Sequence, residues 1–535
     1  MKKPEGKNIK SQIGVNGTEY VYEDIPYWDK AKKQNRHNRE YIGKMDADGE
    51  FIPNKKYLAR MQESEERAAS ITAGRVYWGA THLLDEIGRI TGVTADIEAA
   101  FPFMGREMLS LAYYLVLESD SPMYRFGRWA HDHVYPFGAG ISSQRISDIM
   151  RDVSEDGKMA FFRMQAGRRQ DKEYLAYDTT SVSSWSDYIK AVRYGKNKDG
   201  DKLPQVNMAL VFGEDSTLPV YYRVLPGNIS DVVIVKNLLK DVSFLEIDKL
   251  KLVMDRGFYS ADNINSLFKG HYKFLISVKK NVKLVSGIVK KAKETIQDFR
   301  NYDEVHDVYC YSTAAKWPYV EKNRHGQVVV QEDRRIYVHV YYNGTRAESE
   351  KQRFVKYLAE AKSAVLSEAE LTEAQKKLVS SYFNVKETPK RGTQIEYRED
   401  EIKRHMDDLG YFVLMSNDIK APYDAIETYR RKDMVEKAFD NLKERLEMKR
   451  TSVHSDETLH GRFFLQFLAL IFISYLHKHM RDHDLYRNYT MHSLLDSLDV
   501  IERFEHKGRR PHYSEVTEKQ KKIYECFGAS LSNTL

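Results

Sequence analysis

Two aspartates interrupt stretches of the sequence that otherwise have the composition of β-strands. Asp178 lies inside the run LAYDTTSV, and Asp255 closes the run KLVMDRGF. An Asp among strand-forming residues is unfavourable by propensity, and it is costly when it is buried alone. Two carboxylates at a common rim of a sheet repel each other unless a positive charge lies between them. A divalent metal ion supplies that charge, and Mg²⁺ prefers oxygen ligands. The alternative is that each aspartate caps a turn or a helix.

A third carboxylate lies in a later segment with helical spacing, YRRKDMVEKAFDNLKERL. Tyr429, Lys432, Glu436 and Lys443 fall near one face of such a helix, because offsets of 3, 7 and 14 residues return close to the same side. A tyrosine, two lysines and a glutamate therefore form a stripe. The alternative for this composition is a solvated face of salt bridges.

A mixed sheet is the element that must position the aspartates. From Lys172 onward, three strand-like runs are followed by a helix-like segment, a fourth strand that ends near Asp255, a short helix and a fifth strand. This order, β-β-β-α-β-α-β, predicts a mixed sheet with helices on its faces. A further strand is expected at 411–417, and two more helices at about 425–445 and 458–479.

The regions before and after this sheet differ from it in amino-acid composition and in the spacing of their apolar residues. The first residues are polar, aromatic and basic with short alternating runs, which predicts a small β-unit, and the next hundred have helical spacing that suits a helix-turn-helix. One long charged helix is expected from about 347 to 382. The predicted division of the chain is 1–62 (N-terminal β-rich basic region), 63–170 (helical DNA-binding domain), 171–280 (first part of the sheet core), 281–410 (insertion), 411–480 (second part of the core) and 481–535 (C-terminal tail).

Composition narrows the class of protein. At 535 residues the chain is too long for one core of about 100–200 residues, so several domains are expected. With a net charge of only +6, the protein can bind nucleic acid only through local basic patches on its surface. The two cysteines, Cys310 and Cys526, exclude a disulfide framework and a Cys-based zinc site. Because the first residues lack a signal-peptide core and the longest apolar run, Phe463–Leu476, is too short for a membrane span, we expect a cytoplasmic protein with no membrane partner.

The three carboxylate motifs resemble those of a known family. The signature Tyr-x2-Arg-x3-Glu-x6-Lys marks the insertion sequence 4 superfamily of DDE transposases, and Tyr429, Lys432, Glu436 and Lys443 have its spacing. The runs YDTTSV and DRGFYS resemble the first and second Asp motifs of the same group. Lys432 stands where the family usually has Arg, and Asp433 where Trp is common. The positive charge is therefore kept, but the bidentate fork of Arg is lost.

The resemblance, which extends from about residue 20 to about residue 480, implies a fold and partners. The fold is multidomain α/β: a ribonuclease H-like mixed sheet flanked by helices, with a β-rich insertion, preceded by the small β-unit and a helical DNA-binding region. The implied function is that of a DNA transposase that binds the terminal inverted repeats of an insertion sequence and catalyses metal-dependent cleavage and strand transfer. The implied partners are double-stranded DNA, as transposon ends and target, and a second copy of the chain in a homodimer on DNA within the bacterial cytoplasm.

The resemblance also implies the roles of individual residues. The carboxylates expected to ligate two Mg²⁺ ions, for which Mn²⁺ substitutes, are Asp178, Asp255 and Glu436. The residues expected to hold DNA phosphates are Tyr429, Lys432, Lys443 and Arg256.

Some alternatives stay open on the residues alone. A basic run is either a solvated helix or a phosphate track; its members are Lys279, Lys280, Lys283, Lys290, Lys291 and Lys293. Trp317 is either a core aromatic or a stacking platform for a displaced base. For the function, the alternatives are a metal-dependent nuclease of the same fold that cuts without strand transfer, and an inactive, domesticated DNA-binding protein.

Overall fold

The structure is a computed structural model, and it divides the chain into two compact units. The first unit comprises Met1–Tyr77, Ile501–Glu515 and Leu535, and the second comprises Trp78–Val500 and Val516–Thr534. The residues that the structure describes are 8–14, 17–29, 34–46, 49–58, 60, 74–118, 122–168, 173–184, 186, 188–195, 203–229, 235, 237–239, 251–323, 325–388, 392–432, 440, 445–446, 450–451, 455–505 and 511–531.

The described part of the first unit is made mainly of strands. Four of them form an antiparallel sheet in chain order: β1 (Ile9–Ile13), β2 (Glu19–Asp29), β3 (Gln34–Met45) and β4 (Phe51–Pro53). Val21, Ile42 and Phe51 form its small core. A second, three-stranded sheet pairs β18 (Glu502–Phe504) with both β5 (Val76–Tyr77) and β19 (His512–Tyr513). Strands therefore lie where the alternating runs predicted a small β-unit.

Helices open the second unit, as their spacing predicted. They are α2 (Gly79–Thr91), α3 (Val93–Ala100), α4 (Gly105–Leu117), the single turn η1 (Met123–Arg125), α5 (Phe126–Asp132), α6 (Ser143–Asp152) and α7 (Glu155–Gly167). Two of these helices begin at serines that cap them. The Ser142 hydroxyl accepts the N–H of Arg145 at 3.1 Å, and the Ser154 hydroxyl accepts that of Gly157 at 3.2 Å.

A ten-stranded mixed sheet is the centre of the described part of this unit, in the order β11-β12-β13-β16-β10-β9-β6-β7-β8, with β17 pairing one end of β6. The five strands predicted after residue 172 are β6 (Leu175–Ser184), β7 (Gln205–Gly213), β8 (Pro219–Pro226), β9 (Lys251–Met254) and β10 (Lys273–Val278). β6, β7 and β8 are antiparallel neighbours, whereas β9 runs parallel to both β6 and β10. The short turn η2 (Arg256–Phe258) and helix α9 (Ala261–Lys269) connect β9 to β10.

The segment after β10 extends the same sheet and adds helices. Its elements are α10 (Lys283–Lys293), η3 (Phe299–Asn301), β11 (Tyr302–Asp303), β12 (Val308–Lys322), β13 (Val328–Tyr342), α11 (Gly344–Leu366), α12 (Glu373–Tyr382), the hairpin β14 (Phe383–Thr388) and β15 (Gly392–Tyr397), α13 (Glu399–Met406) and β16 (Tyr411–Ser416). The prediction of one helix over 347–382 was wrong. α11 ends at Leu366, and Thr372 and Gln375 form a capping box that begins α12.

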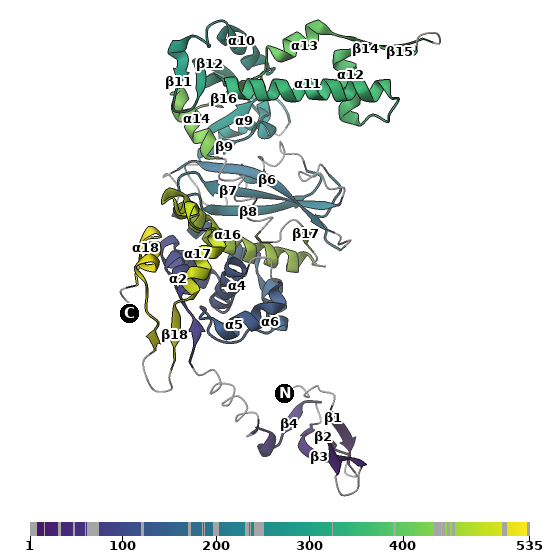
Figure 1. The fold of residues 1–535 in the computed structure, drawn as a ribbon, viewed down its shortest axis with the longest axis vertical. Helices are drawn as coiled ribbons and strands as arrows, with labels where there is room; N and C mark the ends of the chain where they lie inside the picture. The colour runs from purple at the N-terminus through teal and green to yellow at the C-terminus, as the bar shows by residue number, and fades with distance from the viewer. Residues whose placement is uncertain are drawn as a thin grey trace. The chain divides into compact units, whose positions relative to one another are not determined.

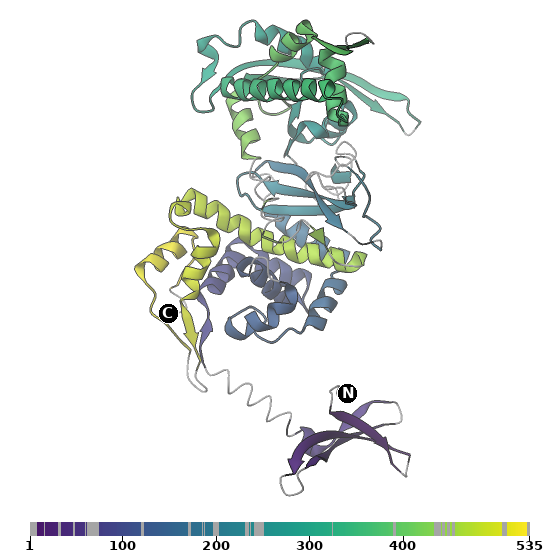
Figure 2. The same ribbon diagram turned by 45° about the vertical axis from the view of Figure 1, so that its right-hand side comes forward.

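The last part of the chain returns to the sheet. It contains α14 (Pro422–Arg431), β17 (Arg450–Thr451), α16 (Asp456–Asp482), η4 (Leu485–Arg487), α17 (Met491–Asp499) and α18 (Glu518–Cys526). Figures 1 and 2 both show α16 passing between the strands β6–β8 and the helices that open the unit. On α16, Phe464 and Phe467 contact the ring of Phe162 from α7, which also contacts Tyr221 and Tyr222 of β8.

Helix α16 lies where a helix was predicted at about 458–479, and it contains the longest apolar run of the sequence. By length and composition alone it is also the one helix of the described residues that could cross a membrane, but 89% of its most apolar window is buried inside the protein. Its apolar side chains are covered by the sheet on one side and by helices on the other, so its hydrophobicity is used in packing.

Gly461 of α16 lies against the backbone of α6, and its replacement by alanine tests this packing. A Cβ at Gly461 would lie 1.8 Å from the carbonyl oxygen of Met150, which cannot move aside as a side chain can. Gly461→Ala is therefore expected to lower the free energy of unfolding by about 1–3 kcal/mol, the usual cost of overpacking a core.

Gly287→Ala in α10 is the matched control for this measurement by denaturant unfolding. Nothing lies within 4 Å of a Cβ at Gly287, so this replacement is expected to be neutral or to stabilise by up to about 1 kcal/mol. Equal unfolding free energies for the two variants would contradict the close approach of α16 to α6.

Candidate active site

The two aspartates predicted from the strand pattern lie side by side on neighbouring parallel strands. The register of β6 and β9 pairs Tyr177 with Met254, so the next residue of each strand segment is an aspartate. Asp178 is still within β6 and is buried, whereas Asp255 follows the last residue of β9 and begins the turn η2. The sheet therefore brings both carboxylates to one rim.

The ammonium of Lys432 lies between these carboxylates. Its Nζ is 3.1 Å from Oδ2 of Asp255 and 3.9 Å from Oδ2 of Asp178, and the lysine is only 2% exposed. A shared cation of this kind offsets the repulsion between two neighbouring carboxylates. The Asp255 side chain is 35% exposed and that of Asp178 is 12% exposed, so solvent reaches the pair mainly from the Asp255 side.

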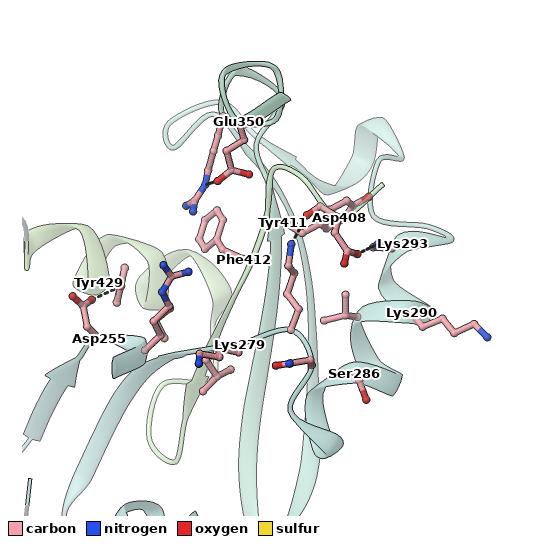
Figure 3. Close-up of a pocket in the computed structure, with 17 residues that line it drawn as sticks. Asp255, Lys279, Ser286, Lys290, Lys293, Glu350, Asp408, Tyr411, Phe412 and Tyr429 are labelled. Atoms are coloured by element: carbon pink, nitrogen blue, oxygen red, sulfur yellow. Dashed lines mark hydrogen bonds and ion pairs between the residues drawn. The ribbon is translucent and has the colours of Figure 1, made fainter. Parts of the chain in front are cut away.

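Each carboxylate also accepts a hydrogen bond. The hydroxyl of Tyr429 donates to Oδ1 of Asp255 at 2.7 Å, as the dashed line in Figure 3 marks. Oδ1 of Asp178 accepts the backbone N–H of Thr179, also at 2.7 Å. One oxygen of each carboxylate is therefore held by a neutral donor, while the other faces the lysine.

Helix α14 presents Tyr429 and Lys432 to the aspartates. Pro422 occupies the start of the helix, where its missing N–H costs nothing. Ala425 and Ile426 are buried in a core cluster with strands β9, β10 and β16, and Tyr429 packs against the same cluster. Residues three and four apart lie on one helix face, so the packing of Ala425 and Ile426 directs Tyr429 toward the same rim, and Lys432 follows it one turn later.

Arg431, at the C-terminal end of α14, is paired with three carboxylates, two of which belong to another element. The guanidinium of Arg431 lies 2.5 Å from Asp215, 2.6 Å from Glu427 and 3.4 Å from Glu214. Burial raises the pKa of Glu214 to about 8, although the charge of Arg431 acts in the opposite direction. Glu214 and Asp215 belong to the turn between β7 and β8, so this cluster ties the residue before Lys432 to the sheet.

A cavity of about 850 Å³ opens beside Asp255 (Figure 3). It runs from Asp255, Arg256 and Tyr429 past the end of β10 to α10, the start of α11 and β16. Its charged lining residues are Asp255, Arg256, Lys279, Lys280, Lys290, Lys293, Arg346, Glu350 and Asp408.

The carboxylate pair fits a divalent cation. Carboxylate oxygens are the hard donors that Mg²⁺ prefers, and the space between them already accommodates the positive charge of Lys432. Among the residues that the structure describes, no group of three His, Cys, Asp or Glu side chains could hold a metal ion. Glu436, the third expected ligand, lies outside the described residues, as does Lys443.

Carboxylates beside a cavity with surplus positive charge define a class of site suited to phosphate-bearing substrates. The family described as Transposase DDE domain matches residues 169–472, which is more than half of the chain and includes both aspartates. The chain therefore belongs to the DDE transposase domain family. No match was found among curated proteins.

One similar solved structure is a piggyBac transposase, in a cryo-EM structure of its synaptic complex with hairpin DNA. The similarity covers 83% of this chain and 70% of that chain, at 10% sequence identity and a TM-score of 0.32.

The structure places other candidate residues that the sequence left open. Trp317 is 4% exposed, and its Nε1–H donates to Oδ1 of Asn265 at 2.8 Å, so it is a core aromatic rather than a stacking platform.

The sequence did not predict the residues at the far wall of the cavity, which include Arg346, Glu350 and Asp408. No local pattern links them to Asp255, because they lie about 90–150 positions further along the chain.

Lys432→Met is expected to destabilise the metal-free protein by roughly 1–3 kcal/mol, because it leaves two neighbouring carboxylates without their shared cation. Breaking a fully buried pair costs about 3–5 kcal/mol, and the partial exposure of Asp255 lowers that figure. The measurement is thermal unfolding with and without Mg²⁺, where added metal is expected to restore more of the melting temperature in the variant than in the parent protein.

Lys420→Met, which removes an exposed lysine just before α14, is the matched control and is expected to change little. Lys432→Arg keeps the charge and is expected to keep most of the stability. A melting temperature for Lys432→Met equal to that of the control would show that the carboxylates do not depend on this cation.

Proposed function

We propose that the chain is a transposase that binds the terminal inverted repeats of an insertion sequence and catalyses metal-dependent DNA cleavage and strand transfer. The observation that carries the proposal is the pair Asp178 and Asp255 on adjacent parallel strands, bridged by one cation, within the region that matches the transposase family. Such a pair is the arrangement that oxygen-ligated metal catalysis at phosphorus requires.

The proposal includes a ribonuclease H-like core. Its support is the strand order β8-β7-β6-β9-β10, in which β8, β7 and β6 are antiparallel neighbours and β6, β9 and β10 are parallel. Asp178 lies on β6 and Asp255 directly follows β9. The insertion sequence 4 superfamily is proposed on the spacing of Tyr429, Lys432, Glu436 and Lys443.

In the proposed mechanism, Asp178, Asp255 and Glu436 would hold two divalent ions, Mg²⁺ or Mn²⁺. When bound, these ions would supply Lewis-acid stabilisation of the attacking and leaving oxygens. Tyr429 orients Asp255 through its hydroxyl, and Lys432 offsets part of the negative charge of the two carboxylates. Arg256, which lines the cavity next to Asp255, together with Tyr429, Lys432 and Lys443, would hold phosphates of the DNA.

Alanine variants of the three carboxylates test this function. Asp178→Ala, Asp255→Ala and Glu436→Ala are each expected to abolish cleavage of a duplex carrying the repeats that flank the coding sequence, while leaving binding to that duplex largely intact. Products are resolved on a denaturing gel, with Asp262→Ala, an exposed carboxylate on α9, as the matched control. Near-normal cleavage by any one of the three variants would remove that residue from the assignment.

The metal requirement is tested in the same assay. Activity is expected with Mg²⁺ or Mn²⁺ and to be poor with Ca²⁺, whose looser coordination suits in-line attack badly. Full activity in excess chelator would overturn the metal-dependent mechanism.

The products of the same assay distinguish the alternative functions. Products joined to target DNA are expected from a transposase and not from a nuclease that only cuts. Binding to the repeats without any cleavage would favour the inactive DNA-binding protein.

The proposed partners follow from the same function. The substrate would be double-stranded DNA, both as the two ends of the element and as the target, and pairing two ends would require a homodimer on DNA. The helices that open the second unit and the basic strands of the first unit are the proposed end-binding regions.

A further inference from the structure

We propose that the cavity beside Asp255 is a phosphate track, which holds the backbone of one DNA strand next to the catalytic carboxylates without reading its sequence. The inference rests on the proposed function and deepens it by naming the residues that would receive the strand. It also decides between the two interpretations of the basic run after β10, of which some members line the cavity and others do not.

The cavity carries more positive charge than its own carboxylates use. Arg346 is paired with Glu350 at 2.8 Å, Lys293 is paired with Asp408, and Asp255 is paired with Lys432. Among the described residues, three of the other lining cations have no carboxylate partner, namely Arg256, Lys279 and Lys290, and a fourth, Lys280, donates to a backbone carbonyl instead. In Figure 3, Lys279 lies on the side of Asp255, and Lys290 lies at the far side with its ammonium pointing outward. Surplus charge therefore continues from the carboxylates to the outer rim.

The wall of the cavity is held by hydrogen bonds. The ammonium of Lys280 donates to the backbone carbonyl of Asp408, and burial lowers the pKa of Lys280. The carboxylate of Glu350 accepts the N–H of Gly410 at 2.9 Å. The cavity is thus built on three separate elements that are fixed to one another, which distinguishes it from a surface where lysines merely gather.

The three aromatic side chains that line the cavity already contact other groups of the protein; Tyr429 packs against a core cluster and donates its hydroxyl to Asp255. Phe412 is stacked on Tyr341 with ring centroids 4.9 Å apart, and the guanidinium of Arg346 lies 5.2 Å from the centroid of Phe412. The ammonium of Lys293 lies 5.1 Å from the ring of Tyr411. Because these rings have partners, a bound strand would be recognised through its phosphates rather than by base stacking, and binding would be indifferent to sequence.

Helix α10 divides its lysines between two sides. Val285, Val289 and Ala292 are its buried residues. Lys290 and Lys293 line the cavity, whereas Lys283 and Lys291 do not, although both are exposed. The chain therefore offers a matched comparison, because lysines of the same run can be removed either from the cavity or from the surface outside it.

The test measures DNA binding in EDTA, so that no chemistry occurs, over a series of KCl concentrations. The probes are a short fluorescein-labelled single-stranded oligonucleotide of random sequence and the same oligonucleotide as a duplex. For the double variant Lys279→Gln/Lys290→Gln, the log–log slope of the binding constant against salt is expected to become shallower by about 0.7 for each lost phosphate contact on the single strand. The control, Lys283→Gln/Lys291→Gln, is expected to keep the parental slope.

Two results would overturn the phosphate track. One is an unchanged slope for the cavity pair, or an equal change for the cavity and control pairs, which would mean ordinary surface charge. The other is a change seen only with the duplex, which would overturn the assignment to one strand. Arg256→Gln, from a different element, is expected to shift the slope in the same direction and guards against a local folding defect in α10, which thermal unfolding of each variant also checks.

The outcome is separable from that of the proposed function. Binding in EDTA does not depend on the carboxylate triad, so the slopes can support or overturn the track whatever the cleavage assay shows. If cleavage requires Asp178 and Asp255 but the salt slopes of the cavity and control variants do not differ, the transposase function would stand and the phosphate track would be rejected.

Discussion

Two carboxylates held next to each other need a positive charge between them, and much of the second unit serves that requirement. Without it, ionised Asp178, which is buried, and Asp255 would repel each other across adjacent strands. Lys432 supplies the charge in the structure as it stands. An ammonium that is 2% exposed has lost most of its hydration, so it depends on the carboxylates beside it and on the packing that positions its helix.

The aspartates and helix α14 are held in position by parts of the chain that are distant in sequence. The parallel pairing of β6 and β9 places the two aspartates side by side at the same rim of the sheet. The packing of the apolar face of α14 directs Tyr429 and Lys432 toward that rim. Arg431, with its carboxylate partners on the β7–β8 turn, holds the end of the helix. Behind the sheet, α16 fills the space between the strands and the first helices, so the sheet rests on a packed layer.

The aspartate rim and the approach of Tyr429 and Lys432 to it could be predicted from the sequence, because both depend on local patterns, whereas Glu436 and Lys443 of the predicted stripe lie outside the described residues. Strand runs with a period of two and a helix with a period near 3.6 already specify which residues share a rim or a face. The break between α11 and α12 was missed because the charged pattern continues through it, while the capping box at Thr372 decides the boundary. The far wall of the cavity had no signal in the sequence, because Arg346 and Asp408 meet the end of β10 only through the sheet order.

The lysine at position 432 is informative because the family resemblance leads one to expect arginine there. A guanidinium forms its best contacts as a planar fork with one carboxylate, whereas an ammonium is a compact charge with three donors. Lys432 lies within 4 Å of oxygens from two different carboxylates, a role that suits a point charge better than a fork. The departure from the usual residue is therefore consistent with a cation shared by the aspartates. A divalent ion at that rim would compete with Lys432 for the same oxygens, so under the proposed function this one side chain would couple the stability of the protein to metal binding.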